Sequence, residues 1–402
     1  MIKNDLNTSE YDWNAINSKW VNMRALAMMA LDGTSFHQDA TNLEQVGDLS
    51  DYNRGDIRGI RLGVGGTINF DRAWTYLASG SVNSFAHDFN STKDDRFTLF
   101  DFVLGIPVWG EYTRVQIGKM KEPISMERTM GMVFEQVMER PMHLDALLSS
   151  RNTGISISNL VADKRITWKA GFYSRYFERG TNSWSKSNRQ AVVRVTTVAY
   201  EDKEAQRLLH LGTAYRYEDI REKTVRYDVG PEQYFVDPWL DTGEFTADSS
   251  NTVNLELTYL DGPLWLASEY TATAVDAPQS RNPIFKGFHV AANYFFTGEH
   301  REYNYRRAVV RRITPILDFS KEGWGAVELS ARYSYMDLSD RAIKGGEMDI
   351  TSLGLIWHPR RDIQFHVQWS RANLDKASSQ TGRYPLNGHA DIMQFRLLLV
   401  VD

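Results

Sequence analysis

Strict alternation of side-chain character is the feature of this sequence that most constrains its fold. In residues 325–338, GAVELSARYSYMDL, apolar Val327 and Leu329 alternate with polar Glu328 and Arg332. Side chains on a β-strand point to opposite faces with period two, so the segment predicts a strand with one apolar and one polar face. In a soluble sheet the apolar face would pack on a core. In a membrane barrel it would meet lipid, and the polar face would line a lumen.

Segments of this kind recur along the whole chain. Period-two matching places them at 19–31, 57–70, 73–85, 97–106, 112–120, 152–161, 165–177, 189–200, 207–218, 252–261, 263–274, 286–297, 324–337, 348–358, 361–373 and 391–401. Short connections alternate with long ones, notably 121–151, 219–251 and 298–323. An even number of strands with short turns on one rim and long loops on the other is typical of outer-membrane barrels. We expect residues 1–402 to form a single all-β domain, a sixteen-stranded antiparallel transmembrane β-barrel.

Composition argues against several other classes of protein. The 402 residues contain no run of about 18 apolar residues that could form a transmembrane helix. No cysteine is present, which argues against thiol chemistry and Cys-ligated zinc, and the nine histidines show no HExxH spacing. We therefore expect no metal and no cofactor. The net charge of −5 and the lack of a basic tail give no reason to expect nucleic-acid binding.

The two ends of the sequence carry two further expectations. The start, MIKNDLNTSEYDW, has no apolar stretch of the export-signal type, so we expect a mature or trimmed form. The end, LLLVVD, lacks the aromatic last residue common in outer-membrane barrels, which also suggests trimming or a divergent assembly signal.

Aromatic residues tend to fall near the ends of the predicted strands. Because their rings favour the lipid headgroup region, they predict two girdles around a barrel. The alternative is that aromatics are simply common in β proteins. The residues concerned are Trp20, Trp74, Trp109, Trp168, Tyr259, Trp265, Tyr294, Trp324, Trp357 and Trp369.

The polar faces are too hydrophilic to form a second packed layer. Unpaired buried polar groups would cost about 1–3 kcal/mol each, a cost that a water-filled lumen removes. The strand phase places these basic residues inside: Arg24, Arg61, Arg114, Lys169, Arg175, Arg194, Arg216, Arg332 and Arg396. It places fewer acids there: Asp101, Glu256, Glu269 and Glu328. A net basic wall would favour anions, although arginines on a wet face are also often paired with acids.

Four motifs give a more specific indication. The stretch RVQIGKMKEPISMERTMGMVFEQVMERPMHLD (114–145) is followed in order by VDPWLDTGEF, LDGPLWLASEYTA and FKGFHVAANYFFTGEHREYN. In order and spacing they resemble the phosphate-selective porin O and P family across nearly the whole chain. That resemblance implies a trimeric sixteen-stranded porin, integral to the bacterial outer membrane among lipid and lipopolysaccharide, whose third loop, about 121–151, folds into the barrel. By position it matches Arg24, Arg58, Arg128 and Arg140 to an arginine ladder and constriction, and Arg221, Lys223 and Arg226 to the outer mouth.

The sequence also departs from the phosphate-selective pattern. Gly59 follows Arg58 where those members have a second arginine, and Asn304 and Thr314 stand where they have lysines. A nearby run of arginines, at 306–307 and 311–312, could compensate. Lys119 and Lys121 are interpreted as structural or rim charges.

The function expected from these features is passive diffusion of small anions, such as phosphate or polyphosphate, with no bond made or broken. One alternative is a general, weakly selective porin. Another is a barrel enzyme, for which His366 and Ser370 share a strand face. A soluble lectin-like β protein is the third alternative.

Overall fold

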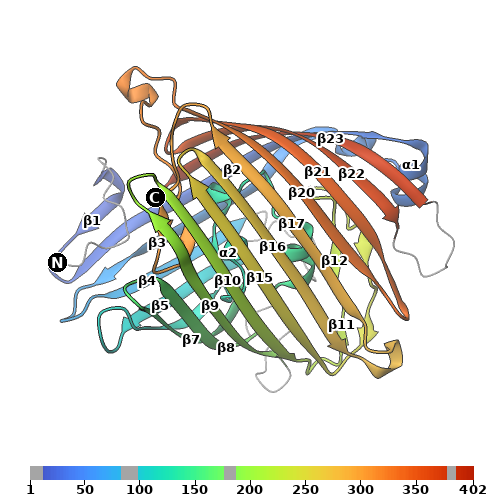
Figure 1. Cartoon of the computed structure of the whole chain (residues 1–402), viewed down its shortest axis with the longest axis horizontal. Coiled ribbons are helices and arrows are strands. Elements are labelled where there is room, and N and C mark those ends of the chain that lie inside the picture. The colour runs from blue at the N-terminus through green and yellow to red at the C-terminus, as the bar shows by residue number, and fades with distance from the viewer. Residues whose placement is uncertain (1–11, 83–97, 176–186, 378–385) are drawn as a thin grey trace.

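The computed structural model describes residues 12–82, 98–175, 187–377 and 386–402, and within them sixteen strands close into an antiparallel barrel (Figure 1). The strands are β2 (Val21–Gln38), β3 (Arg54–Ile68), β4 (Trp74–Val82), β5 (Thr98–Pro107), β6 (Arg114–Met120), β7 (Asn152–Val161), β8 (Ile166–Ser174), β9 (Arg189–Asp202), β10 (Arg207–Asp219), β15 (Ser249–Asp261), β16 (Leu264–Asp276), β17 (Ile284–Phe295), β20 (Ala326–Asp340), β21 (Ile343–Arg360), β22 (Ile363–Lys376) and β23 (Leu386–Val401). Strand β2 pairs with both β3 and β23, which closes the barrel. The predicted fold class and all sixteen segments are confirmed.

The strand boundaries differ from the predicted ones at several ends. The first strand continues to Gln38 rather than ending at residue 31, because alternation persists through a stretch of mixed polarity. Residues 83–85, 97 and 176–177, which fall in predicted strands, lie outside the described residues.

Shorter elements occupy the connections and the N-terminal side. The small strands are β1 (Ala15–Asn17), β11 (Thr224–Val225), β12 (Asp228–Val229), β13 (Leu240–Asp241), β14 (Phe245–Thr246), β18 (Tyr303–Asn304) and β19 (Val309–Val310). The helical turns are η1 (Asp12–Asn14), α1 (Ala40–Val46), η2 (Ser50–Tyr52), α2 (Met126–Thr129), η3 (Met132–Phe134), α3 (Met142–Leu147), η4 (Pro278–Ser280) and η5 (Phe319–Lys321). Among the described residues, no helix is both long and apolar enough to cross a membrane.

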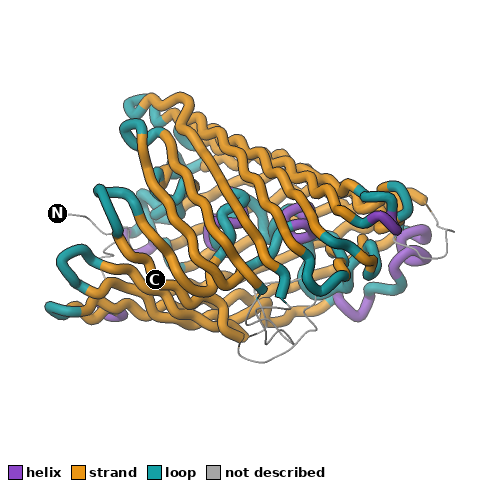
Figure 2. Tube along the Cα trace, turned by 90° about the horizontal axis from the view of Figure 1, so that it is seen from below, coloured by secondary structure: helices purple, strands orange, loops and turns teal. Residues whose placement is uncertain are grey.

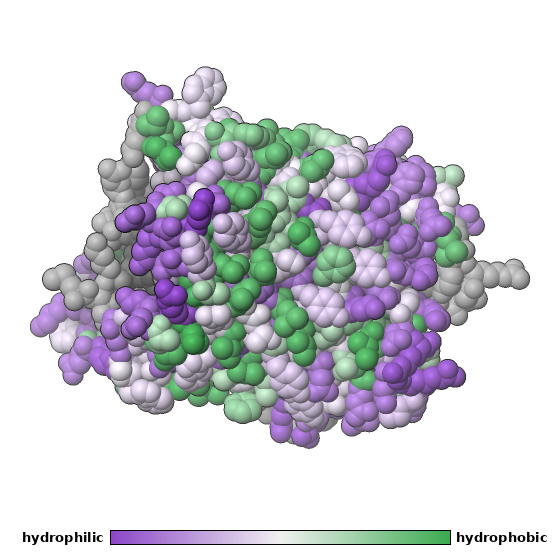
Figure 3. All heavy atoms as spheres, viewed as in Figure 1, coloured by the Kyte–Doolittle hydropathy of each residue, from purple (hydrophilic) through white to green (hydrophobic). Residues whose placement is uncertain are grey.

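The two faces of the wall have the characters that the alternation predicts. On the outer face of β20, Leu329 is 43% exposed, whereas Glu328 and Arg332 on the inner face are buried. Figure 3 shows apolar residues gathered in a band over the outer face, between more polar ends. Apolar side chains therefore face outward along the barrel, where lipid would lie.

The connections separate into two rims. The loop rim carries 39–53, 121–151 and 220–248, and the opposite turn rim carries short turns such as 162–165 and 262–263. One long connection, 296–325 between β17 and β20, lies on the turn rim, so the expected division into short turns and long loops is not complete.

The loop-rim half of the interior is packed with apolar side chains, which the expectation of a polar inner wall did not include. Toward this rim the inward positions of β20–β23 become apolar: Met336, Leu338, Met348, Ile350, Leu374 and Ile392. They pack against apolar residues of 121–151 and 220–248, among them Leu144 and Trp239. Figure 2 shows helical turns enclosed by the strands. Water-accessible polar lining is therefore concentrated nearer the turn rim.

The aromatic residues expected to form two girdles lie mostly at strand ends on the turn rim, so they form one girdle there, and Trp369 lies in the middle of β22. Trp20, Trp109 and Trp324 are well exposed near strand ends there. Trp265 was placed in the girdle but is 1% exposed, and its ring lies 4.7 Å from the Arg301 guanidinium inside the barrel. In the alternation of β16, Trp265 is an inward-facing position, so its ring lies inside the barrel although it is close to the strand end.

Candidate functional site

The connection 121–151 lies against the inner wall and is held there largely through its backbone. The Met126 N–H donates to Glu256 at 2.7 Å, and the Glu127 N–H donates to Glu269 at 2.8 Å. Farther along, the Met138 N–H donates to Gln368 on β22 at 2.9 Å. Buried carboxylates and amides of the wall thus satisfy backbone groups of the segment, which fixes its position in the lumen.

A second segment enters the barrel from the turn rim, within the connection 296–325. The Ala308 carbonyl accepts a hydrogen bond from Arg194 at 2.9 Å. Val309 and Val310 pack with Met126 and Met130 of the first segment. The two segments therefore meet inside the lumen and narrow it from opposite rims.

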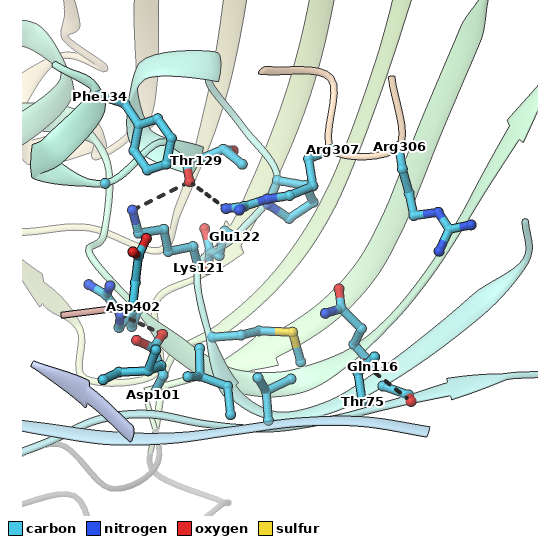
Figure 4. A pocket seen from close by; sticks show the side chains of 18 of the residues that line it. Thr75, Asp101, Gln116, Lys121, Glu122, Thr129, Phe134, Arg306, Arg307 and Asp402 are labelled. Atoms are coloured by element: carbon cyan, nitrogen blue, oxygen red, sulfur yellow. Dashed lines mark hydrogen bonds and ion pairs between the residues drawn. The ribbon is translucent and has the colours of Figure 1, made fainter. Parts of the chain in front are cut away.

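A cavity of about 510 Å³ lies between these segments and the wall on the turn-rim side (Figure 4). Its charged lining consists of eight basic residues, Arg61, Arg114, Lys121, Arg151, Lys169, Arg194, Arg306 and Arg307, and three acidic residues, Asp101, Glu122 and Asp402. We call it the turn-side cavity.

Three of these basic groups have no carboxylate within ion-pair distance among the described residues. The Lys121 amine donates to the carbonyls of Thr129, at 3.5 Å, and Met130. Lys169 donates to Gln116 at 2.5 Å, and the Arg306 guanidinium lies 5.8 Å from the Tyr112 ring centroid. Burial, and then the charges of Arg140 and Arg151, lower the pKa of the Lys121 amine.

Four of the other basic groups of the cavity share acids or contact the inward segments. Arg61 and Arg151 both pair with Asp101, which leaves one positive charge in excess. Arg194 pairs with Glu256 at 2.7 Å. Arg307 donates to the Thr129 carbonyl at 3.4 Å, and Figure 4 shows it converging on this carbonyl with Lys121.

Of the basic residues expected on the inner face, four line this cavity: Arg61, Arg114, Lys169 and Arg194. The others lie elsewhere in the barrel. Arg58 forms two hydrogen bonds to Glu139, of 2.9 and 3.1 Å, and Arg332 pairs with Glu232.

The loop arginines contact the loop itself. Arg128 pairs with Asp145 and donates to the Ser149 carbonyl at 3.1 Å. Arg140 pairs with Glu135 at 2.7 Å. Such partners satisfy buried guanidinium groups and hold the loop in shape.

Two more of the expected pore residues lie toward opposite ends of the lumen. Arg175 approaches Glu218 at 3.9 Å, and Arg24 donates to the Asp402 carbonyl at 3.2 Å.

The expected outer-mouth residues lie in the connection 220–248 on the loop rim. Each has a nearby acid: Arg221 pairs with Asp219 at 2.5 Å, Lys223 with Asp248 at 2.7 Å and Arg226 with Asp241 at 2.6 Å.

Lys121 and Arg151 were not expected to line the pore, whereas Arg306 and Arg307 belong to the run of arginines expected to compensate for missing lysines. Lys121 was interpreted as a structural or rim charge; its bonds to the Thr129 and Met130 carbonyls agree with the structural alternative, and the residue also lines the cavity. Asn304 stands where a lysine was expected. Its side-chain oxygen accepts a hydrogen bond from the Arg307 backbone N–H at 3.0 Å, which stabilises the turn that carries Arg306 and Arg307 into the cavity lining.

The residues considered for an enzyme do not meet in the structure. The His366 ring bonds to Gln364 at 3.1 Å, whereas the Ser370 hydroxyl lies 2.9 Å from that of Ser352. Within the described residues, no group of three or more His, Asp or Glu side chains is arranged to hold a metal ion.

A closed sixteen-stranded barrel with an apolar outer face and a constricted lumen defines the class of outer-membrane porins. The family model described as phosphate-selective porin O and P matches residues 30–400, and the chain belongs to this family of integral outer-membrane channels.

Solved porin structures share the fold at low identity. OmpT of Vibrio cholerae is 10% identical with a TM-score of 0.56, and the match covers 96% of this chain and 100% of that one. The anion-selective porin from Comamonas acidovorans is 10% identical with a TM-score of 0.55, over 95% and 100% of the two chains. Pseudomonas putida OprB is 6% identical with a TM-score of 0.57, over 95% and 94%.

An uncharacterized protein of Caulobacter vibrioides is 29% identical over 183 residues. That match spans 44% of this chain and 37% of the relative's length.

Proposed function

We propose that the protein is a channel for passive diffusion of small anions, with phosphate or polyphosphate as candidate solutes. The observation that carries the proposal is the lining of the turn-side cavity, with eight basic and three acidic residues at the constricted part of the lumen. Positive charge in a narrow, low-dielectric passage raises the local anion concentration and repels cations.

Selection in such a channel needs transient binding only. Guanidinium and ammonium groups donate several hydrogen bonds to oxyanions, and Arg can do so in a bidentate manner. Arg306 and Lys169 have neutral partners, so an anion would not have to displace a carboxylate from them. The Comamonas acidovorans neighbour is an anion-selective porin, which agrees with this proposal.

A general, weakly selective porin is the second candidate. The observation favouring it is that many inward arginines are neutralised by carboxylates, as in the pairs Arg216–Glu122 and Arg396–Asp32. In this case the charge excess of the cavity would be too small to bias passage.

The zero-current potential across a potassium chloride gradient, measured with purified protein in a planar bilayer, separates the two candidates. A chloride-selective potential, with conductance reduced by added phosphate, supports the oxyanion channel. A potential near zero without phosphate block favours the general porin.

We also propose a homotrimer whose contacts are made by the shortest part of the wall. Strands β6 and β8 have seven and nine residues, whereas β2 and β21 have eighteen. Phe102 and Phe172 on this short wall are 61% and 71% exposed. A Vibrio cholerae neighbour has been solved in a trimer form. The rest of the apolar belt would face outer-membrane lipid and lipopolysaccharide. The molar mass of the protein in detergent, measured by light scattering, tests this assembly.

A further inference from the structure

An apolar projection leaves the turn rim between β17 and β20. The connection 296–325 first enters the lumen and then turns outward at residues 314–325, which form the loop at the upper left of Figure 1. Ile316 and Leu317 are each 60% exposed, Phe319 is 50% exposed and Trp324 is 82% exposed. We call residues 314–325 the apolar knob.

The knob is an ordered turn rather than a loose strand connection. The Gly323 N–H donates to the Asp318 carbonyl, and the Gly325 N–H donates to the Leu317 carbonyl, both at 2.9 Å. The Ile316 N–H donates to Glu299 at 3.1 Å, which ties the knob to the inward half of the connection. These hydrogen bonds fix the backbone of the knob, and its apolar side chains project outward from it.

Aromatic contacts join the knob to the outer face of the barrel. The Phe319 ring lies 5.4 Å from Trp357, which stacks on Phe365 at 5.2 Å. Phe365 is 40% exposed on the outward face of β22, and the Trp357 indole donates to the Trp324 carbonyl. The knob therefore extends the aromatic girdle at the turn rim without a break.

The knob lies on the side of the barrel away from the short wall. Counted around the barrel from β2, β6 is the fifth strand and β20 the thirteenth, so they are half a turn apart. A copy seated on the short wall would not cover the knob. Isolated exposed apolar residues need no explanation, but a contiguous group continuous with a lipid-facing surface marks an interaction site.

We propose that the apolar knob inserts into the headgroup and upper acyl region of the phospholipid leaflet at the turn rim. Trp and Phe side chains favour this interfacial depth, and the knob projects from the girdle that occupies it. The knob thereby anchors the connection whose first half carries Arg306 and Arg307 into the lumen. This inference does not depend on which solute the channel passes.

The absence of cysteine allows a single-site test. Leu317→Cys is labelled with an environment-sensitive fluorophore and folded into phosphatidylethanolamine–phosphatidylglycerol vesicles, some carrying a nitroxide near the headgroup. Lys203→Cys is the matched control, because Lys203 lies in a short turn of the same rim with a 79% exposed side chain. The proposal predicts several-fold stronger quenching by nitroxide lipid at position 317, with a blue-shifted emission, and stronger quenching by aqueous iodide at position 203.

Equal iodide quenching at both positions overturns the proposal. Protection of position 317 from both quenchers, with cross-linking to a second copy, also overturns it, because the occupant is then protein. Where Leu317→Cys does not fold, Ile316→Cys provides the same readout from the neighbouring exposed side chain. Because the measurement reports lipid contact at position 317 and not ion passage through the lumen, its outcome is separable from that of the selectivity experiment.

Discussion

Replacing Arg306 by Gln tests whether charge at the turn-side cavity sets anion preference. The Arg306 side chain lines the cavity, is half-buried and has its guanidinium 5.8 Å from the Tyr112 ring centroid. The substitution removes a positive charge without leaving a buried carboxylate unpaired, so the barrel should fold normally.

The size of the effect follows from the cavity. A volume of 510 Å³ corresponds to a sphere of roughly 5 Å radius, so a lining charge acts on a central ion from about 6–8 Å. With an effective dielectric constant between about 40 and 80, Coulomb's law gives about 0.5–1.4 kcal/mol. This corresponds to a decrease of about two- to ten-fold in local anion occupancy.

The assay is the zero-current potential in a potassium chloride gradient, compared with that of Arg207→Gln. Arg207 lies at the same rim, pairs with Asp261 and does not line the cavity, so its loss changes net charge equally. We expect the anion-to-cation permeability ratio to fall for Arg306→Gln and to stay near the native value for Arg207→Gln. An unchanged ratio in folded Arg306→Gln protein, or equal decreases in both variants, would refute the reasoning.

Three further predictions concern the loops. Arg128→Ala should loosen the inward segment, because it removes the partner of Asp145 and of two carbonyls and lowers stability by about 2–4 kcal/mol. Increased open-channel noise and protease cleavage within 121–151 would report this change. Gly287→Ala should displace helix α3, because the added Cβ would lie 2.5 Å from the His143 Cβ. The overpacking should lower the free energy of unfolding by about 1–3 kcal/mol, and a lower melting temperature would report it. Burial, opposed by Arg226 and assisted by the facing Asp241, raises the pKa of Asp228 from 3.8 to about 6. The protonated carboxyl is therefore favoured in the folded β12–β13 pair at low pH. The pair loses up to about 3 kcal/mol of stability as the pH rises from about 4 through 6. Hydrogen exchange of residues 224–246 from pH 4 to 8 should show this loss, and Asp228→Asn should abolish it.

The barrel wall was predictable from sequence because a strand imposes a period of two on every residue. Once Leu329 is placed outward, Glu328 and Arg332 must point inward, and the structure confirms this for the whole of β20. The same rule, applied strictly, would have placed Trp265 inside. The girdle expectation for that residue failed because proximity to a strand end was used in place of phase.

The interior was less predictable because its contacts join residues far apart in the chain. Arg58 meets Glu139 across 81 positions, and Arg332 meets Glu232 across 100. Period-two patterns give the face of each side chain and contain no information on which inward loop reaches it. For the same reason the sequence could not indicate that Arg306 and Lys121 line one cavity, since they come from connections on opposite rims.

The most direct test of the central claim is to locate anions in crystals of the protein soaked in bromide, using anomalous scattering. Our account predicts bromide peaks inside the turn-side cavity, near Lys169 and Arg306, that disappear when phosphate competes. Peaks confined to the outer surface or to the loop rim around Arg221 and Lys223, with none in the cavity, would contradict it.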